Sequence, residues 1–465
     1  MGKRKKRQES LWVAAAELPT SPGHPFYQKL NAILDAAGFD AFVENVCRPF
    51  YAPVMGRPSL TPGRYFRLFM LGYFEGLDSE RGMAWRASDS LAIRRFLRLG
   101  LDEGTPDHST ISRTRRLIDV ETHRVVFTWI LAQVASAGLL RGKTIGIDAT
   151  TLEANAAMRS IVRRDTGELY PEFLTGLAKA SGIKTPTRAA LARLDRRRRK
   201  RTSNKDWTSP SDPDAKITKM KDGRTHLAHK AEHAVDMETG AIVAVTVQGA
   251  DRGDTSSLDA TLAEAEKQVD AVAATPEGDG QVHEDGLSEV VADRGYSSDR
   301  VLTDLEDRGL RSYIPEPKRK RRKWDGEIDA QLTVYANRRR VRGERGKSLL
   351  RARGELIERS FAHLYETGGM RRTHLRGHPN ILKRVLIHAS AFNLGLLLRK
   401  LVGTGTPRGL QGCTAAFSAL LSRLQVACGA QLDRWLYYRH DLPALFRRCS
   451  PPSGVGGETT SATGC

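Results

Sequence analysis

The chain has 465 residues, which is enough for two or three domains with hydrophobic cores of their own. Lysine and arginine outnumber aspartate and glutamate by 74 to 54, so the formal net charge is +20 and the isoelectric point is near 9.9. Such an excess on a globular chain indicates a polyanionic partner, and nucleic acid is the commonest one.

An anionic membrane surface is the rival partner, and the sequence argues against it. The chain contains no run of 18 uncharged apolar residues, and no apolar signal core follows its basic start. Its five cysteines are sparse and none forms a CxxC pair, which argues against a disulfide framework and a cysteine zinc site. We therefore expect a soluble protein of a reducing compartment, the cytoplasm, that is associated with no membrane.

The first 138 residues predict a basic arm followed by a helical domain. Residues 1–25 combine a basic run with a Ser/Pro/Gly stretch, which is typical of a flexible arm that contacts DNA phosphates or only keeps the chain soluble. Residues 26–138 carry apolar residues at helical spacing, interrupted by Gly and Pro. We expect a helical DNA-binding domain there.

One predicted helix of this region, over 107–118, has a DNA-binding pattern. Asp107 or Ser109 would cap it, and its polar residues include Arg113, Arg115 and Arg116. Such a helix, preceded by another helix and a Gly-containing turn, suits helix-turn-helix docking in a major groove. An ordinary surface helix would have the same pattern, so both interpretations stay open.

Residues 139–402 predict a second domain, whose first strand leads to an acidic residue. The stretch 144–147 is β-branched and contains Gly, which suits a short strand buried on both faces, and Asp148 stands where this strand should end. A carboxylate at that place is costly unless something pairs with it. An Asx turn that caps the strand is the simplest interpretation, and a functional carboxylate is the alternative.

The composition changes between about 160 and 222. A dense basic run is followed there by a Ser/Pro/Asp-rich segment, which predicts a basic helix and a loop inserted into the second domain. The candidate phosphate contacts in this insertion are Arg196, Arg197, Arg198 and Arg199. A merely solvated surface would have a similar composition.

A hairpin is predicted after the insertion. Residues 225–235 and 241–247 are β-rich and are separated by a Gly-containing turn, so they should join the first strand in a mixed sheet. His226, His229 and His233 occur within the hairpin. Residues three apart on a strand point to opposite faces, which argues against a zinc site.

A second strand repeats the layout around Asp148. Residues 289–292 form a short apolar stretch that ends at Asp293, and Gly295 allows a turn after it. A strand near 313–315 follows, and then a basic run whose candidate phosphate contacts are Lys318, Arg319 and Lys320.

A later helix carries two glutamates beside an apolar stripe. Ile357, Phe361 and Leu364 have the i, i+4, i+7 spacing of a buried helix face. Glu358 flanks this stripe, and Glu355 lies one turn earlier; either could instead be a salt-bridged surface residue. We expect the apolar segment 381–401 to be a core helix, and the extension 403–465 to be partly helical and then disordered.

Asp148, Asp293 and Glu358 are three oxygen ligands that a fold could bring together. Mg²⁺ and Mn²⁺ prefer such ligands. Two such ions, about 4 Å apart, can activate a nucleophilic oxygen and stabilise a leaving one in phosphoryl transfer. Three carboxylates that meet without a cation would repel one another. The acids therefore predict a site for Mg²⁺ or Mn²⁺, with two ions expected, and the basic runs predict a nucleic-acid substrate.

Taken in order, these motifs resemble those of DDE-type bacterial insertion-sequence transposases. The resemblance extends over roughly residues 40–400 and includes a helical region, 56–118, that is similar to the N-terminal domain of that family. The residues that carry it are Gly-Ile-Asp-Ala-Thr at 146–150 with Glu-Ala-Asn at 153–155, Val-Ala-Asp-Arg-Gly-Tyr at 291–296, Glu-Arg-Ser-Phe at 358–361 and Gly-Met-Arg-Arg at 369–372.

The resemblance implies an α/β fold in which an all-α N-terminal domain precedes an RNase H-like core with a mixed five-stranded sheet. In that core Asp148, Asp293 and Glu358 would be the metal-binding, catalytic residues. The implied activity is hydrolysis at the ends of the element, which exposes 3′-hydroxyls, and attack of these hydroxyls on target DNA. We expect a homodimer or a higher oligomer on the DNA. The phosphate contacts expected near the site are Arg359, Arg371 and Arg372.

The chain departs from the family pattern around the glutamate. Relatives often have a Tyr and an Arg upstream of this residue and a Lys seven residues beyond it. Here Gly354 lies four residues before Glu358, and Tyr365 lies seven after it. Arg351 stands four residues before Glu355, so Glu355 competes with the favoured Glu358 as the third acid.

Two other functions stay open at this point. An RNase H-like nuclease or resolvase would need the same acids. A DNA-binding regulator without catalysis would keep the helical domain and the basic runs but would not need the carboxylates.

Overall fold

The computed structural model describes residues 23–52, 59–198, 202–220, 223–318, 324 and 326–411. The predicted N-terminal arm lies almost wholly outside these residues, as do Arg199, Arg319, Lys320 and nearly all of the C-terminal extension.

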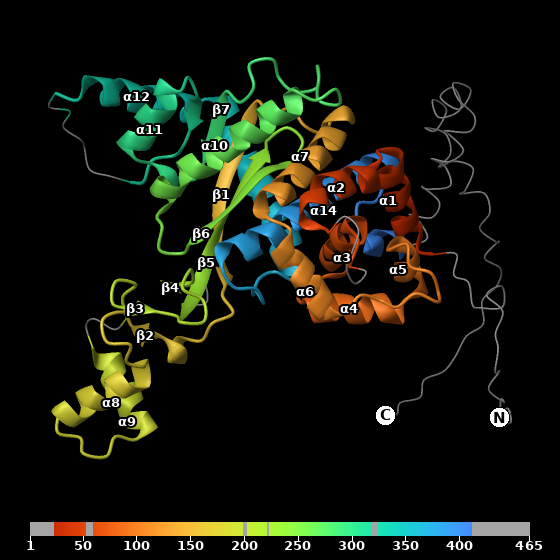
Figure 1. The fold of residues 1–465 in the computed structure, drawn as a ribbon. Coiled ribbons are helices and arrows are strands. Elements are labelled where there is room, and N and C mark those ends of the chain that lie inside the picture. The colour runs from red at the N-terminus through yellow and green to blue at the C-terminus, as the bar shows by residue number, and fades with distance from the viewer. Residues whose placement is uncertain are drawn as a thin grey trace, which may run out of the picture. The chain divides into compact units, whose positions relative to one another are not determined.

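The N-terminal region is helical, as the apolar spacing predicts. Its central helix, α3, is buried along almost its whole length and includes Arg67, whose guanidinium pairs with Asp40 and Asp35. The helices are α1 (Pro25–Ala36), α2 (Phe39–Cys47), α3 (Pro62–Glu75), α4 (Glu80–Asp89), α5 (Leu91–Phe96), α6 (His108–Leu117) and α7 (Val120–Ser136), with a 3₁₀ turn at Arg48–Phe50 (Figure 1).

Helix α14 (His378–Val402) joins this region to the sheet, because it packs on α3, on α7 and on a strand of the sheet. Among the described residues, 378–409 is the one segment long and apolar enough to cross a membrane, and 94% of its apolar window is buried inside the protein. The amide of Asn393 accepts from the backbone N–H of Ile242, at 2.9 Å, and donates to its carbonyl, at 2.8 Å. The prediction of a core helix is confirmed.

The sheet is mixed, with strand order β4-β5-β1-β7-β8, and β6 also pairs with β5. Strand β1 lies between antiparallel β5 and parallel β7, and β8 is parallel to β7. The predicted hairpin is β5 with β6, and the short β4 adds one strand to the five expected. The strands are β1 (Thr144–Glu153), β4 (Lys216–Lys219), β5 (Thr225–Asp236), β6 (Ile242–Gly249), β7 (Glu289–Ala292) and β8 (Arg311–Tyr313).

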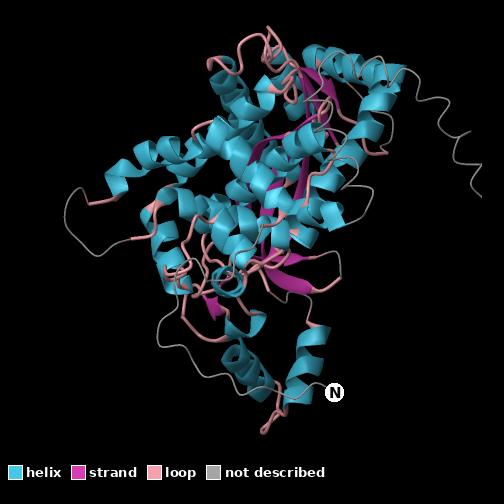
Figure 2. Cartoon of the chain, turned by 90° about the vertical axis from the view of Figure 1, so that its right-hand side faces the viewer, coloured by secondary structure: helices cyan, strands magenta, loops and turns pink. Residues whose placement is uncertain are grey.

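Helices cover both faces of this sheet (Figure 2). Glu232 and His233 are neighbours on β5 and therefore point to opposite faces. Glu232 contacts α10 (Asp254–Ala273), whereas His233 contacts Ser360 of α13 (Glu344–Phe361). Helix α13 continues into a π-helical turn at Ala362–Thr367. Helices α11 (Asp299–Asp307) and α12 (Ile328–Arg342) pack together beside β8.

Two predictions about local structure were wrong. The first strand does not end at Asp148: β1 continues to Glu153, because β5 is long enough to pair with it from Ile145 onward. The insertion is also more structured than a helix and a loop. It contains the helices α8 (Tyr170–Ala180) and α9 (Arg188–Arg197) and the paired strands β2 (Val162–Arg163) and β3 (Trp207–Thr208). A small apolar core holds it together, in which Trp207 packs with Ile161, Ala154, Ala215 and Leu227.

Three fully buried histidines make stability depend on pH. Burial lowers the pKa of His123 and His233 to about 3, and that of His388 well below its ordinary value. The pKa of each of these imidazoles is lower in the folded protein than the value of about 6.5 in the unfolded chain. Their contribution to the free energy of unfolding is therefore complete above about pH 6.5 and is lost as the pH falls. At pH 5 we expect unfolding to take up about three or more protons, which calorimetry in buffers of different ionisation enthalpy would measure. At pH 8 we expect unfolding to cause no proton uptake by these rings. Uptake of one proton or fewer on unfolding at pH 5 would contradict the conclusion that all three rings are neutral in the folded protein.

Candidate active site

The pairing of β1 with β7 places two carboxylates side by side. Ile147 is the partner of Ala292 in this parallel ladder, so the next residues along the two strands, Asp148 and Asp293, are neighbours. Burial is the main cause that raises the pKa of Asp148, and the nearby charge of Asp293 raises it a little further. Asp293 follows the last residue of β7 as predicted, whereas Asp148 lies within β1.

Asp148 is held by an arginine to which the sequence analysis gave no role. Arg353 of α13 donates from Nη1 to Oδ2 of Asp148 at 2.8 Å, and the two side chains are 15% and 27% exposed. Burial raises the pKa of Asp148, Arg353 lowers it, and the net result is a raised pKa. Nε of Arg353 is buried and has no hydrogen-bond partner, so this guanidinium is only partly satisfied where it lies.

Asp293 is part of a tight turn rather than of the sheet. Its Oδ1 accepts from the N–H of Gly295 at 2.7 Å, and its carbonyl accepts from the N–H of Tyr296 at 3.2 Å. This Asx turn opens the 3₁₀ turn Arg294–Tyr296, and α11 follows with Ser298 as its N-cap. The position of the Asp293 carboxylate is therefore set by the turn.

Helix α13 lies directly on β1, because Gly146 has no side chain. A Cβ at Gly146 would come within 2.4 Å of Sδ of Met237, 3.2 Å of Cδ1 of Ile357 and 3.4 Å of Cγ of Arg353. Gly146 is two residues from Asp148 and so faces the same side of the sheet. The close approach brings the C-terminal half of α13, which carries Glu358, over the face on which Asp148 lies.

The two candidate glutamates differ in their direction around α13. Ile357 faces the sheet, and successive residues of a helix are rotated by about 100°. Glu358 is therefore about one quarter-turn from the buried side, whereas Glu355 points almost directly away from it. Both side chains are exposed, and Glu355 pairs with Arg359 at 2.8 Å. In the part of the chain that the structure describes, no three His, Cys, Asp or Glu side chains lie close enough together to hold a metal ion.

The donor set at the two aspartates nevertheless suits a hard divalent cation. Two neighbouring carboxylates repel each other, and Arg353 supplies a positive charge to one of them in this structure. Mg²⁺ retains several waters and is commonly bound through one or two carboxylates. Asp148 and Asp293 fit this requirement, whereas Glu358 is not brought to them in this structure.

The segment after the π-helical turn runs beside the end of β1. The N–H of Glu153 donates to the carbonyl of Arg371 at 3.0 Å, and the carbonyl of Glu153 accepts from the N–H of Thr373 at 2.8 Å. Arg371 also donates to Oγ1 of Thr150 at 3.2 Å, and Asn155 donates to the carbonyl of His374 at 3.2 Å. Residues 153–155 thus hold a basic segment, and its Arg371 reaches Thr150, two residues along β1 from Asp148.

The structure divides the predicted DNA contacts into buried and exposed ones. On α6, which begins after its predicted N-cap Asp107, Arg113 and Arg116 are exposed. Arg115 is only 6% exposed, pairs with Glu80 at 2.6 Å and donates to Asn380, so it joins α6 to α4 and α14. A guanidinium used in this way contributes to packing, so Arg115 is less accessible to DNA than Arg113 and Arg116.

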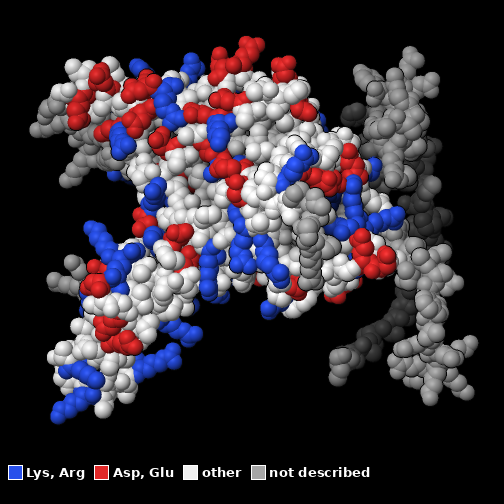
Figure 3. All heavy atoms as spheres, in the orientation of Figure 1, with Lys and Arg blue, Asp and Glu red and all other residues white. Residues whose placement is uncertain are grey.

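The other predicted contacts that fall within the described residues are partly or fully accessible. In the insertion Arg196 and Arg197 are exposed, and Arg198 pairs with Asp195 at 3.3 Å. Figure 3 shows Lys and Arg side chains over the α8–α9 insertion and the adjoining centre of that face, with acidic residues gathered over α10 and α11. Lys318 and Arg372 are exposed, whereas Arg359 and Arg371 are half-buried.

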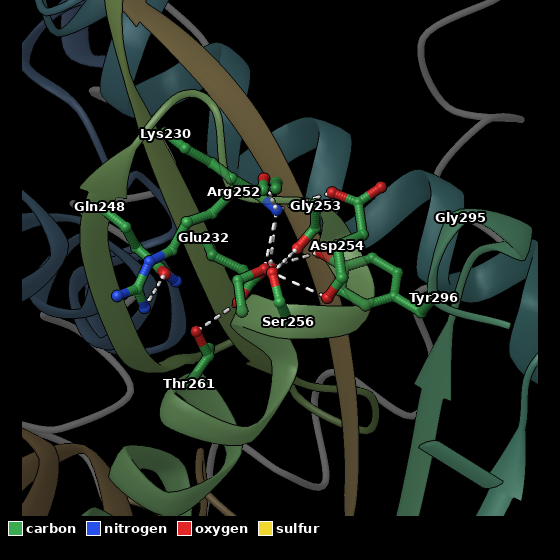
Figure 4. A network of polar contacts seen from close by, with 12 residues as sticks. Lys230, Glu232, Gln248, Arg252, Gly253, Asp254, Ser256, Thr261, Gly295 and Tyr296 are labelled. Atoms are coloured by element: carbon green, nitrogen blue, oxygen red, sulfur yellow. Dashed lines mark hydrogen bonds and ion pairs between the residues drawn. The ribbon is translucent and has the colours of Figure 1, made fainter. Parts of the chain in front are cut away.

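The sequence analysis missed a polar network on the other face of the sheet (Figure 4). Glu232 is fully buried and accepts from the hydroxyls of Tyr296, at 2.6 Å, and Ser257, at 2.8 Å. Lys230 donates to Asp254 at 2.7 Å. The available signal was the pair of charged residues, Lys230 and Glu232, on one face of a predicted strand.

A helical domain followed by a mixed sheet, with one carboxylate on its central strand β1 and another directly after the parallel strand β7, defines an RNase H-like protein of the DDE class. Residues 15–117 match the family model of a transposase domain (DUF772), and residues 185–394 match that of the transposase DDE domain; together they cover more than half of the chain. The chain therefore belongs to the DDE transposases. No curated protein and no solved structure matched it. The DDE match contains Asp293 and Glu358 but begins after Asp148, which the β1–β7 pairing places beside Asp293.

Proposed function

We propose that the protein is a DNA transposase that binds the ends of an insertion sequence, hydrolyses the phosphodiester at each end and joins the 3′-hydroxyls to target DNA. The observation that carries this proposal is the adjacency of Asp148 and Asp293 across the β1–β7 ladder. Two ends must be processed together, so we expect a homodimer or a higher oligomer on DNA. Its DNA substrate places the protein in the cytoplasm, at the nucleoid.

The residues of the site have distinct roles in this proposal. Asp148, Asp293 and Glu358 would hold Mg²⁺ or Mn²⁺, which neutralises charge at the reacting phosphate and lowers the pKa of a bound nucleophile. Glu358 can join the two aspartates by a small movement of α13, because it borders the helix face that rests on β1. Arg371 and Arg372 then lie on the path of the DNA backbone beside the acids.

More distant basic residues would bind the element ends. The exposed Arg113 and Arg116 of α6 suit contacts in a major groove, and Arg196 and Arg197 of α9 suit phosphate contacts. These two groups come from separate parts of the sequence, the helical domain and the insertion. They can therefore contact separate stretches of the same DNA end.

The proposal is tested with the full-length protein, a labelled DNA carrying the terminal repeat and a supercoiled target plasmid. We expect cleavage at the repeat with Mg²⁺ or Mn²⁺, none with EDTA, and joined products in the plasmid. Cleavage without joining would indicate a nuclease or resolvase instead. End binding with no cleavage under any metal condition would indicate a non-catalytic regulator.

Arg353 gives a prediction about metal binding. The guanidinium of Arg353 lies beside the Asp148 carboxylate, so its charge opposes the binding of a cation by the same carboxylate. We expect Arg353→Gln to tighten Mn²⁺ binding at pH 8 at least about threefold, because a repelling charge a few ångströms away is removed. Electron paramagnetic resonance of free Mn²⁺ would measure this without any DNA.

The matched control is Arg351→Gln, which removes the same charge from an exposed position on α13. It should leave Mn²⁺ affinity unchanged. Weaker Mn²⁺ binding by Arg353→Gln would show that Arg353 supports the site instead of competing with the metal.

A further inference from the structure

We propose that Tyr296 and Glu232 position the metal-binding Asp293 from the opposite face of the sheet. This inference rests on the proposed function, because it takes Asp293 to be a metal ligand. Tyr296 ends the turn that begins at Asp293, and its ring is fully buried. Its hydroxyl donates to Oε1 of Glu232 at 2.6 Å (Figure 4). The turn is thereby tied to the central strand β5.

Glu232 is itself firmly held. It is fully buried and accepts hydrogen bonds from Ser257, at 2.8 Å, and from Thr261, both on α10. The ammonium of Lys230 lies 3.6 Å from the Glu232 carboxylate and 6.0 Å from the centre of the Tyr296 ring. A buried carboxylate with this many partners is a fixed acceptor, so the Tyr296 hydroxyl has one defined position.

A second attachment reaches the same turn. Asp254, the first residue of α10, pairs with Lys230 at 2.7 Å and packs against Gly295. A Cβ at Gly295 would lie 2.6 Å from Oδ2 of Asp254 and 2.9 Å from Oδ1 of Asp293. The glycine thus lets both carboxylates approach the turn closely.

The two aspartates differ in their need for such support. Asp148 is fixed by β1, which pairs with β5 on one side and β7 on the other. Asp293 lies beyond the end of β7, so no strand pairing holds its backbone. Two carboxylates that share a cation must also be held against their mutual repulsion. Tyr296, through Glu232, supplies the positional constraint that strand pairing supplies to Asp148.

The test uses Tyr296→Phe in the full-length protein. Residues that orient metal ligands typically contribute ten- to a hundredfold to metal affinity. We expect Tyr296→Phe to weaken Mn²⁺ binding about tenfold, as measured by electron paramagnetic resonance without DNA. The Mn²⁺ concentration for half-maximal cleavage should rise by the same factor, whereas the cleavage rate at saturating Mn²⁺ and the affinity for DNA ends should stay close to wild type.

Tyr27→Phe is the matched control. Tyr27 is equally buried and donates to a carboxylate, that of Glu75, at 2.7 Å, but it lies in the helical domain. The Tyr27→Phe variant should lose as much free energy of unfolding in urea as Tyr296→Phe does, and its Mn²⁺ affinity should be unchanged. Glu232→Gln is a second test, for use if Tyr296→Phe does not fold. It keeps the shape of the side chain but makes it a weaker hydrogen-bond acceptor for Tyr296. We expect it to bind Mn²⁺ at least threefold more weakly than the wild type.

Unchanged Mn²⁺ affinity in Tyr296→Phe, with stability lowered as in Tyr27→Phe, would overturn the inference and show a purely structural role. In that case the wild-type protein would still bind Mn²⁺ and cleave, so the proposed function would stand. A wild-type protein that neither binds Mn²⁺ nor cleaves would instead contradict the proposed function itself.

Discussion

Replacing either Asp148 or Asp293 by Asn should reduce end cleavage by about a thousandfold or more. Each substitution keeps the size of the side chain and removes one negative oxygen ligand from a pair that the β1–β7 register holds together. Losing about 4 kcal/mol of transition-state stabilisation corresponds to this factor, and metal ligation contributes on that scale. Single-turnover cleavage of a labelled terminal repeat at saturating Mg²⁺ measures the loss.

A suitable control is Asp304→Asn. Asp304 also pairs with an arginine, Arg300, but on the exposed surface of α11, where a salt bridge has little effect on stability. It should cleave at the wild-type rate. All three variants should bind the DNA end with wild-type affinity, which separates catalysis from binding. An Asp148→Asn or Asp293→Asn variant that retains more than a tenth of the activity would exclude that residue from the metal site.

The second large effect is expected at Glu358. Glu358→Gln should lower cleavage at least about a hundredfold, whereas Glu355→Gln should change it by less than about threefold. The reason is the direction of each side chain around α13: Glu358 borders the face that packs on β1, and Glu355 points away from it and pairs with Arg359. The same single-turnover assay, with both variants prepared in parallel, measures the difference.

The reverse result, a large loss for Glu355→Gln and a small one for Glu358→Gln, would mean that α13 rotates by about half a turn in the active protein. The spacing of Arg351 before Glu355 would then indicate the true family motif. Equal losses would contradict the assignment of a single third acid on this helix.

Local patterns predicted much of the fold, and the failures have physical causes. The strand ending before Asp293 was predicted because Gly295 and the residues after it break the ladder. The end of β1 was placed too early, since its continuation depends on pairing with β5, which follows some 70 residues later. The basic spacing of α6 did not show that Arg115 is buried, because its partner Asn380 lies 265 residues away.

The same reasoning applies to the site. Asp148, Asp293 and Glu358 could be selected from their chemistry, but their neighbours could not. The contacts Arg353–Asp148 and Tyr296–Glu232 join different elements and leave no local pattern. A pair of charged residues on one face of a predicted strand, such as Lys230 and Glu232, is a local sign of a buried network.

The contact between α13 and β1 leaves little room for a side chain at Gly146, which lies two residues from Asp148. A single methyl group at this position would require the side chain of Met237 to move and would press on Ile357, which is the contact by which α13 packs on β1. An insertion sequence accumulates substitutions when selection on its own movement is relaxed. A copy that has exchanged this glycine could retain every acidic and basic residue of its site and still be silent, so an intact set of charged residues is not sufficient to recognise a mobile copy.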